Sequence, residues 1–292
     1  MTAITPVTTD TVVSAAPFWR LKGFPLIPVS ILLLIAFVAV FADLLAPHDP
    51  QIGSLARRFK PPFWLEGGSL AYPLGTDHVG RDVLSRLIFG GRIAFAVGFA
   101  AAIAACVVGS ALGLAAGYFG GWTDRIVSRI VDVWMAFPPV LFSILLIAVL
   151  GTGLGSVILA IAVIDWTRFC RVVRAEAMSQ ARMDYIENAR IAGFGRFAIL
   201  LREVLPNVLP SIVALLSLEM GIAVIVEAIL SFVNLSISTD DPTWGGMIAE
   251  GRLSIHQAWW MLVFPLITLF LTVLSFSQLG EGLKTHFDPV LR

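Results

Sequence analysis

Long hydrophobic stretches alternate with shorter polar segments along this chain of 292 residues. A membrane-spanning helix needs about 20 mostly apolar residues, and six stretches have this character: residues 24–45, 93–117, 134–150, 155–170, 210–235 and 259–279. The small turn 151–155 predicts a tight helical hairpin between the third and fourth stretches. The third stretch continues backward toward Asp124 as an amphipathic pattern, and a kink is expected at Pro138 and Pro139. The pattern predicts an all-α membrane protein with six transmembrane helices.

Composition supports the membrane class and excludes several others. The chain is 58% hydrophobic and only 14% charged, with zero formal net charge, whereas a soluble domain carries about 25% charged residues. It is too apolar to be disordered, and its charge balance does not suit a nucleic-acid binder. Cys106 and Cys170 lie in apolar stretches without a CxxC pattern, which excludes a disulfide framework.

The distribution of basic residues predicts an orientation. Six spans place both termini on one side, together with residues 119–133 and 171–209, and most of the 20 Lys and Arg residues fall on that side. The positive-inside rule therefore places the N- and C-termini in the cytosol. The opposite side holds residues 46–92, 151–155 and 236–258.

Residues 171–209 contain a short amphipathic pattern between two turns. Apolar residues recur at helical spacing over residues 183–192, with charged residues between them, and Gly193 and Gly195 break the helix. Such a helix, held parallel to the membrane, suits a groove on a cytosolic partner. It equally suits a position on lipid headgroups, and periodicity alone leaves both interpretations open.

The same segment carries a recognisable signature. The run Glu187-Asn-Ala-Arg-Ile-Ala-Gly193, followed after nine residues by Glu203-Val-Leu-Pro206, resembles the EAA motif of ABC-importer permeases. Asn188 stands where the motif has its first alanine, and Glu203 stands at its isoleucine. Gly193, Leu205 and Pro206 match the motif.

Two further blocks narrow the resemblance. The stretch from Pro73 to Arg86, and the stretch from Glu227 to Phe232 with the loop that follows it, are similar to the C-type permease subunit of the dipeptide, oligopeptide and nickel group. The similarity extends from about residue 18 to the end of the chain. One departure is residues 233–236, where the group usually has a Leu-Gly-Leu-Gly-like turn.

The resemblance implies the fold and the activity. It implies a type I ABC-importer permease bundle with a cytosolic coupling helix, in the bacterial inner membrane. Such a subunit forms half of the pathway for di- or oligopeptides, nickel chelates, opines or related solutes, and works by alternating access. The implied divisions are residues 1–91 (tail, first span and outer loop), 92–283 (permease domain) and 284–292 (cytosolic tail).

The implied partners are a second homologous permease in a heterodimer, two ATPase subunits, and a periplasmic or lipid-anchored binding protein. ATP and Mg bind the ATPase subunits, and this chain itself is expected to be non-catalytic, without a cofactor or metal. By resemblance, the residues implied to dock the ATPase are Asp184, Tyr185, Glu187, Ala189, Arg190, Ala192, Gly193, Leu205 and Pro206.

Charged residues inside the spans form a second candidate site. Such residues are rare, and they often mark functional sites. In this chain they are Asp165, Glu219 and Glu227. Asp165 can pair with Arg168. Glu219 and Glu227 are eight residues apart, about 80° around a helix. They can line an aqueous path and contact a cationic group, or brace neighbouring helices. A rival function is a secondary transporter or channel, driven by an ion gradient through these two glutamates.

Other patterns predict structure rather than chemistry. Thr76 and Asp77 are expected to cap a helix that begins near Val79 and lies at the outer membrane surface. Metal ligation by Asp77, His78 and Asp82 is the less favoured interpretation, because the four histidines show no ligand spacing. No P-loop is present, since Leu283 replaces the glycine before Lys284.

Small and aromatic residues mark expected packing positions. Gly109, Gly113 and Gly117 form consecutive small-xxx-small patterns, which let helices approach closely. Trp244, Trp259 and Trp260 are expected at the membrane interface.

Overall fold

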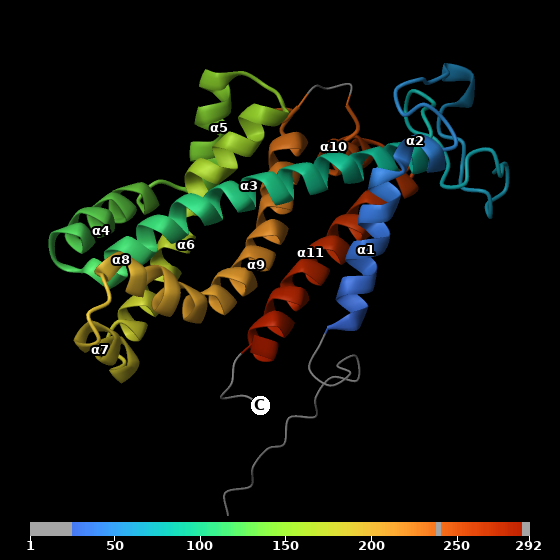
Figure 1. Ribbon diagram of the computed structural model, residues 1–292. Helices are drawn as coiled ribbons and strands as arrows, with labels where there is room; N and C mark the ends of the chain where they lie inside the picture. Colours follow the sequence, from blue (N-terminus) through green and yellow to red (C-terminus); the bar gives the residue numbers. More distant parts are fainter. Residues whose placement is uncertain (1–24, 238–240, 288–292) are drawn as a thin grey trace, which may run out of the picture.

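The computed structural model describes residues 25–237 and 241–287, and the named elements in this range are all helices (Figure 1). The first half of the chain forms α1 (Leu26–Val40), α2 (Ala42–Leu45), η1 (Leu55–Arg57), α3 (Val83–Phe119), α4 (Gly121–Met135) and α5 (Pro139–Leu150). The second half forms α6 (Leu154–Gln180), α7 (Asp184–Ile191), α8 (Arg196–Ile199), the π-helix η2 (Leu200–Val204), α9 (Leu205–Phe232), α10 (Trp244–Leu253) and α11 (Trp260–Phe287). The predicted N-terminal tail and the last residues of the C-terminal tail lie outside the described residues.

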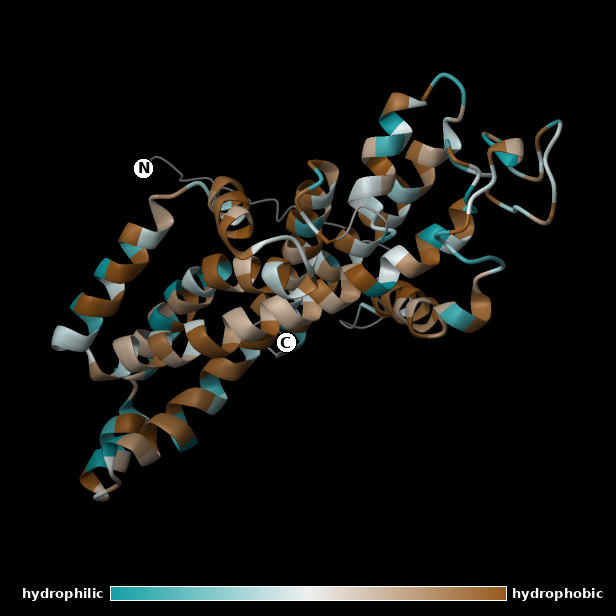
Figure 2. Ribbon diagram, turned by 90° about the horizontal axis from the view of Figure 1, so that it is seen from above, coloured by the Kyte–Doolittle hydropathy of each residue, from teal (hydrophilic) through white to brown (hydrophobic). Residues whose placement is uncertain are grey.

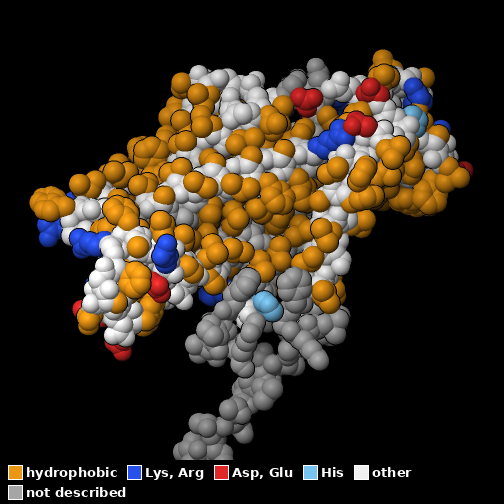
Figure 3. Space-filling model, in the orientation of Figure 1, with side chains coloured by type: hydrophobic (Ala, Val, Ile, Leu, Met, Phe, Trp, Pro, Cys, Tyr) orange, Lys and Arg blue, Asp and Glu red, His pale blue; other side chains and the backbone are white. Residues whose placement is uncertain are grey.

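The all-α membrane class is confirmed, because each predicted stretch contains a helix. Among the described residues, three helices are long and apolar enough to cross a membrane: 83–119, the continuous helix 196–232, and 260–286. The pair α4 and α5 is a fourth if it counts as one span, and α1 is shorter. The helices are largely hydrophobic (Figure 2), and charged side chains lie mostly toward the two ends of the visible face (Figure 3). Six spans therefore remain a prediction.

Helix ends differ from the prediction at two places. The expected separate helix at the outer surface is wrong, because α3 runs unbroken from Val83 to Phe119. The adjacent Gly90 and Gly91 do not interrupt this helix. Gly90 allows close packing, because a Cβ there would lie only 2.8 Å from Trp244 Cδ1. The helix that contains the predicted fourth span is longer than that span, since α6 continues to Gln180 with polar residues beyond the apolar stretch.

The predicted kink at the two prolines is confirmed. Helix α4 ends at Met135, α5 begins at Pro139, and the two helices are bent by 85°. The amphipathic pattern before the kink is the separate helix α4, whose Val127 and Val131 are buried. The hairpin predicted at residues 151–155 joins α5 to α6.

The three glycines of α3 bring its backbone against α6. A Cβ on Gly109 would lie 2.2 Å from the Trp166 carbonyl oxygen, and one on Gly113 would lie 2.7 Å from the Cys170 carbonyl oxygen. A Cβ on Gly117 would lie 2.5 Å from the Arg174 carbonyl oxygen. The predicted close approach is thus confirmed, and its partner is a helix of the same chain.

Two of the three tryptophans expected at the membrane interface are instead buried. The Trp244 indole donates a hydrogen bond to the Leu87 carbonyl at 2.9 Å, and the Trp260 indole donates to the Thr76 carbonyl at 3.1 Å. The interface prediction is wrong for these two because each indole N–H has a backbone partner inside the protein. They attach α10 to α3, and α11 to the loop that precedes α3.

Substitution of Gly109 tests the α3–α6 contact. Gly109→Ala places a methyl group against the α6 backbone and should destabilise the fold by about 1–3 kcal/mol, the usual effect of overpacking. The measurement is thermal unfolding of the purified protein in detergent. Gly155→Ala is the control, because a Cβ there meets nothing within 4 Å. Equal melting temperatures for both variants would contradict the contact.

Candidate functional site

Helix α7 spans Asp184–Ile191, within the predicted residues 183–192, and protrudes at one end of the bundle (Figure 1). Its C-terminal turn ends at Gly193, whose φ is +83°. The Gly193 amide donates to the Arg190 carbonyl at 3.0 Å, and the Phe194 amide donates to the Ala189 carbonyl at 3.1 Å. A left-handed residue here is the usual way to end a helix, and it favours glycine.

One face of α7 is anchored to the bundle. Ile186 is fully buried in a cluster with residues of α3, α6 and the 199–212 segment, and half-buried Tyr185 and Ala189 pack against it. The Tyr185 hydroxyl donates to Gln180 Oε1 at 2.7 Å, and Asn207 Nδ2 donates to the same hydroxyl at 3.3 Å. Helix α7 is therefore tied to both α6 and α9.

The opposite face of α7 is exposed. It carries Asp184, Glu187, Asn188, Arg190, Ile191, Ala192 and Gly193. Arg190 Nη1 lies 3.1 Å from Glu187 Oε2, and Ile191 is 78% exposed. Half-buried Leu205 packs against the cluster that contains Ile186, and exposed Pro206 follows it, directly before the Asn207 that binds Tyr185.

Exposed apolar residues extend this face beyond the expected set. Phe194 and Phe197 follow α7 and are 54% and 72% exposed. The sequence could have indicated these two residues, because they are hydrophobic and lie close to Gly193 and Gly195, which interrupt the helical pattern. We call Ile191, Phe194 and Phe197, with the exposed side of α7, the α7 face.

The charged residues within the helices form two separate groups. Arg168 Nη1 of α6 lies 3.3 Å from Glu219 Oε2 of α9, and Arg168 Nε lies 3.9 Å from Asp165 Oδ1. The predicted Asp165–Arg168 contact is present, while the link from Arg168 to Glu219 was not expected. Glu219 is 2% exposed, whereas the Arg168 side chain is 37% exposed.

Glu227 has a different set of partners. It is buried, and it accepts hydrogen bonds from Ser231 Oγ at 2.5 Å and Ser236 Oγ at 3.2 Å. These contacts hold the residues after α9 against the end of that helix. Glu219 and Glu227 therefore do not share one site in this structure.

A third charged group joins the loop before α3 to α10. Asp77 Oδ2 accepts from Arg81 Nε and Arg86 Nη1, both at 2.6 Å. Glu250 Oε2 accepts from Arg86 Nη1 at 2.5 Å, and Glu250 Oε1 accepts from Arg81 Nη2 at 3.2 Å. We call these four residues the outer-loop network; it links the loop, the start of α3 and α10.

The charges of the network shift the pKa of its acids. Burial alone would raise the pKa of Asp77, but the charges of Arg86 and Arg81 outweigh it and lower that pKa below its ordinary value. Burial would likewise raise the pKa of Glu250, but hydrogen bonding to Arg86 and the charges of Arg86 and Arg81 lower it. Both carboxylates therefore stay ionised.

The prediction that Thr76 and Asp77 cap the helix after this loop is wrong, because a different residue caps it. Asp82 caps α3 by accepting from the Ser85 amide at 3.0 Å. Asp77 instead closes a turn, accepting from the Val79 and Arg81 amides at 2.9 Å each. Asp77, His78 and Glu250 are close enough for a shared cation, but Asp77 and Glu250 already bind two guanidinium groups.

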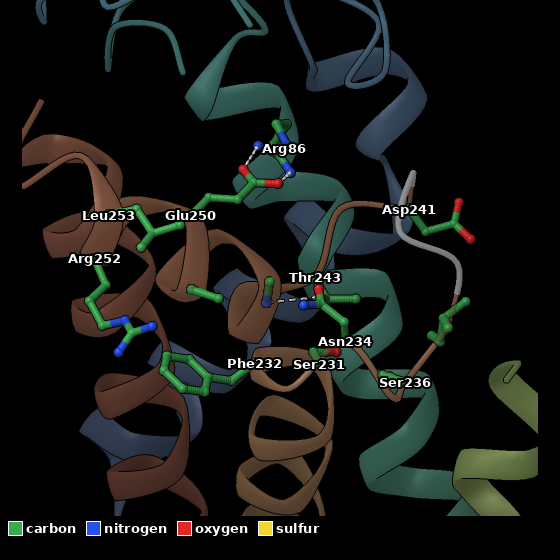
Figure 4. Close-up of a pocket in the computed structure, with 13 residues that line it drawn as sticks. Arg86, Ser231, Phe232, Asn234, Ser236, Asp241, Thr243, Glu250, Arg252 and Leu253 are labelled. Atoms are coloured by element: carbon green, nitrogen blue, oxygen red, sulfur yellow. Dashed lines mark hydrogen bonds and ion pairs between the residues drawn. The ribbon is translucent and has the colours of Figure 1, made fainter. Parts of the chain in front are cut away.

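A polar cavity of about 210 Å³ lies beside Arg86 and Glu250, between α9 and α10 (Figure 4). Figure 4 shows the ion pair at one side of this cavity, and Thr243 capping α10 at another. The outer-loop network thus forms part of the cavity wall.

Comparisons with known proteins agree on one family. Residues 109–292 match the family described as binding-protein-dependent transport system inner membrane component. The di/tripeptide permease protein DppC of Pseudomonas aeruginosa is 36% identical over 261 residues, covering 89% of this chain and 86% of that protein. The dipeptide permease protein DppC of Escherichia coli K12 is 38% identical, with coverage of 94% and 91%. The glutathione permease protein GsiD of Pectobacterium atrosepticum is 38% identical, with coverage of 90% and 85%.

Solved structures support the fold. An inward-facing structure of the MetNI methionine ABC transporter matches with a TM-score of 0.58 at 19% identity, covering 70% of this chain and 97% of that one. An amino acid ABC transporter with histidines matches with a TM-score of 0.50 at 16% identity, covering 70% and 95%.

The outer-loop network predicts a stability that depends on pH. Because the pKa values of Asp77 and Glu250 are lowered in the folded state, their contribution is complete above the ordinary values of 3.8 and 4.5. It is lost as the pH falls below those values. Glu250→Gln should cost about 1.5–3 kcal/mol at pH 7, and the difference from the wild type should shrink near pH 3.5.

Thermal unfolding in detergent at both pH values measures this difference. Glu66→Gln is the control, because Glu66 is exposed. A difference between Glu250→Gln and the wild type that stays constant with pH would contradict the role of the network.

Proposed function

Because this chain belongs to the family of binding-protein-dependent transport system inner membrane components, we propose that it transports short peptides or related solutes such as glutathione. It is a permease subunit of an ABC importer. The peptide assignment is supported by relatives named as di/tripeptide, dipeptide and glutathione permeases, each similar over most of its length.

The α7 face is the docking surface for an ATPase subunit in this proposal. The supporting observation is its two-sided character: Ile186 and Tyr185 fix one side to the bundle, while the charged and apolar side chains on the other side are exposed, and Arg190 and Glu187 there pair with each other. Apolar residues flanked by charges are typical of a protein interface. Asp184, Glu187, Arg190 and Ile191 would contact the ATPase, and Tyr185, Ala189, Leu205 and Pro206 would hold the helix in position.

The anchoring of α7 provides a route for transmitting force. A displacement of α7 would reach α6 through Gln180 and α9 through Asn207, because Tyr185 bonds to both. Rigid-body movement of packed helices is a common basis of such transitions. Closure of ATP-bound partners would in this way alternate the opening of the pathway.

The proposed assembly contains this permease, a second homologous permease, two ATPase subunits that hold ATP and Mg, and a substrate-binding protein. In this arrangement the α7 end and both termini face the cytosol, and the loop before α3 faces the periplasm. Residues 92–283 would form the permease domain, preceded by an anchor helix and outer loop in 1–91.

Co-purification and transport test this function. The tagged chain, purified from its own host, should bring ATPase subunits and a second permease with it. Reconstituted vesicles should take up Ala-Ala only with ATP and the binding protein. Uptake driven by an ion gradient without ATPase subunits would instead support a secondary transporter that uses Glu219 and Glu227.

A charge on the α7 face should weaken ATPase binding. Ile191→Asp buries a carboxylate in the proposed interface and should lower the affinity for the ATPase subunits at least tenfold, with unchanged thermal stability because Ile191 is exposed. Leu70→Asp is a matched control, since Leu70 is also 78% exposed but lies in the loop before α3. Pull-down from detergent measures the affinity; wild-type binding by Ile191→Asp would exclude this face.

Gly193 should be required for coupling. Gly193→Val places a β-branched residue at φ +83°, which costs about 1–2 kcal/mol and tilts the end of α7. ATP hydrolysis should continue while uptake falls. Gly195→Val is the control, because Gly195 has φ −67° and ψ 148°, which valine adopts readily. Normal coupled uptake by Gly193→Val would contradict the proposal.

A further inference from the structure

The charged group formed by Arg168, Asp165 and Glu219 lies deep within the bundle. Arg168 is near the middle of α6 (Leu154–Gln180), and Glu219 is near the middle of the continuous helix 196–232. Both carboxylates are almost completely buried, while the Arg168 side chain is 37% exposed. The guanidinium is therefore the charged part of this group that remains accessible.

Exposing a guanidinium to the hydrocarbon core at this depth has a large free-energy cost. A charged side chain near the bilayer centre costs several kcal/mol, and such residues face a water-filled cavity or another protein surface. The two carboxylates account for Arg168 Nη1 and Nε. Among the described residues, no hydrogen bond involves Nη2, which leaves its two N–H donors available.

A cavity lies one helical turn along α6 from Arg168, which is not itself among the residues that line it. Val172 of α6 and Leu218 of α9, next to Glu219, line a cavity of about 460 Å³ between α6, α9 and α11. Polar and charged groups are added to its wall by Glu176, Ser211, Ser277, Glu281 and Lys284. This volume falls within the range of small-ligand sites, and a mixed polar and apolar lining is typical of them.

We propose that Arg168 contacts the substrate in the translocation pathway, donating from Nη2 to its carboxylate group, with Glu219 and Asp165 holding the guanidinium in place. The proposal rests on the proposed function, because a pathway and a peptide substrate are its premises. Arginine suits this role because its planar fork keeps donors free for a carboxylate while other donors remain paired. Of the two roles expected for Glu219, this arrangement uses the bracing role, because Glu219 links α9 to α6 and orients the Arg168 guanidinium.

Substitution of Arg168 tests this contact in the complete importer. Arg168→Gln should lower ATP-dependent uptake of Ala-Ala at least tenfold, while stimulation of ATP hydrolysis by the binding protein persists. The preference for Ala-Ala over its C-terminal amide should shrink, because only the free peptide offers a carboxylate. Arg168→Lys should restore part of the uptake. Arg171→Gln is the control, since Arg171 lies on the same helix and is exposed.

A labelling experiment covers the case in which Arg168→Gln fails to fold. Arg168→Cys, in a chain with Cys106→Ser and Cys170→Ser, should react with a membrane-impermeant, negatively charged thiosulfonate. Val107→Cys should remain unlabelled. Val107 is an exposed residue of the apolar helix α3, and we expect its side chain to face lipid, which the charged reagent does not enter.

Several outcomes would overturn the inference and separate it from the proposed function. The inference would be wrong if Arg168→Gln kept wild-type uptake and the wild-type preference for Ala-Ala over its amide, or if Arg168→Cys were not labelled. Either result would exclude Arg168 from the pathway and leave the proposed importer function unchanged. Loss of the second permease from Arg168→Gln would place Arg168 in a subunit interface. Loss of uptake in Glu219→Gln but not in Arg168→Gln would make the carboxylates the contact. Failure of the wild-type importer to take up Ala-Ala would overturn the peptide assignment first, and this inference with it.

Discussion

The backbone contact between α3 and α6 fixes the positions of the other functional elements. Three glycines, one per turn, let the α3 backbone reach the carbonyl groups of α6 without side chains between them. Helix α6 then carries Arg168 near its middle and Gln180 at its end, where Tyr185 of α7 is bonded. Changing the spacing of α3 and α6 would move both the buried charges and the α7 face.

Charged residues inside the bundle serve as links between elements. Arg168 joins α6 to α9, Arg174 joins α6 to Asp124 of α4, and Arg86 joins α3 to Glu250 of α10. A charge in an apolar environment needs a partner, so each pair restricts how its two helices can move. Glu227 follows the same rule with two hydroxyl partners.

The sequence predicted local features more reliably than contacts between distant residues. The amphipathic pattern and Gly193 predicted α7 within one residue at each end, and the glycine spacing predicted a close helix contact. Periodicity could not identify α6 as the partner of those glycines. It also could not show that Trp244 and Trp260 are buried, because an indole suits an interface and a core equally well. The pairing of Arg168 with Glu219, 51 residues apart in the chain, depends on how α6 and α9 cross.

The unbroken length of α3 gives the two ends of the molecule a mechanical connection. At 37 residues the helix is about 55 Å long. Its C-terminal part, with Leu114 and Tyr118, packs in the cluster that holds Ile186 of α7. At its other end, the Leu87 carbonyl and Arg86 hold α10 through Trp244 and Glu250. A separate surface helix followed by a span would have had a joint between these two ends. Because α3 has none, a tilt imposed at the α7 end must also displace the attachment of α10. The α7 face and the outer-loop network are therefore attached to opposite ends of one unbroken helix, so a displacement of one end is transmitted to the other.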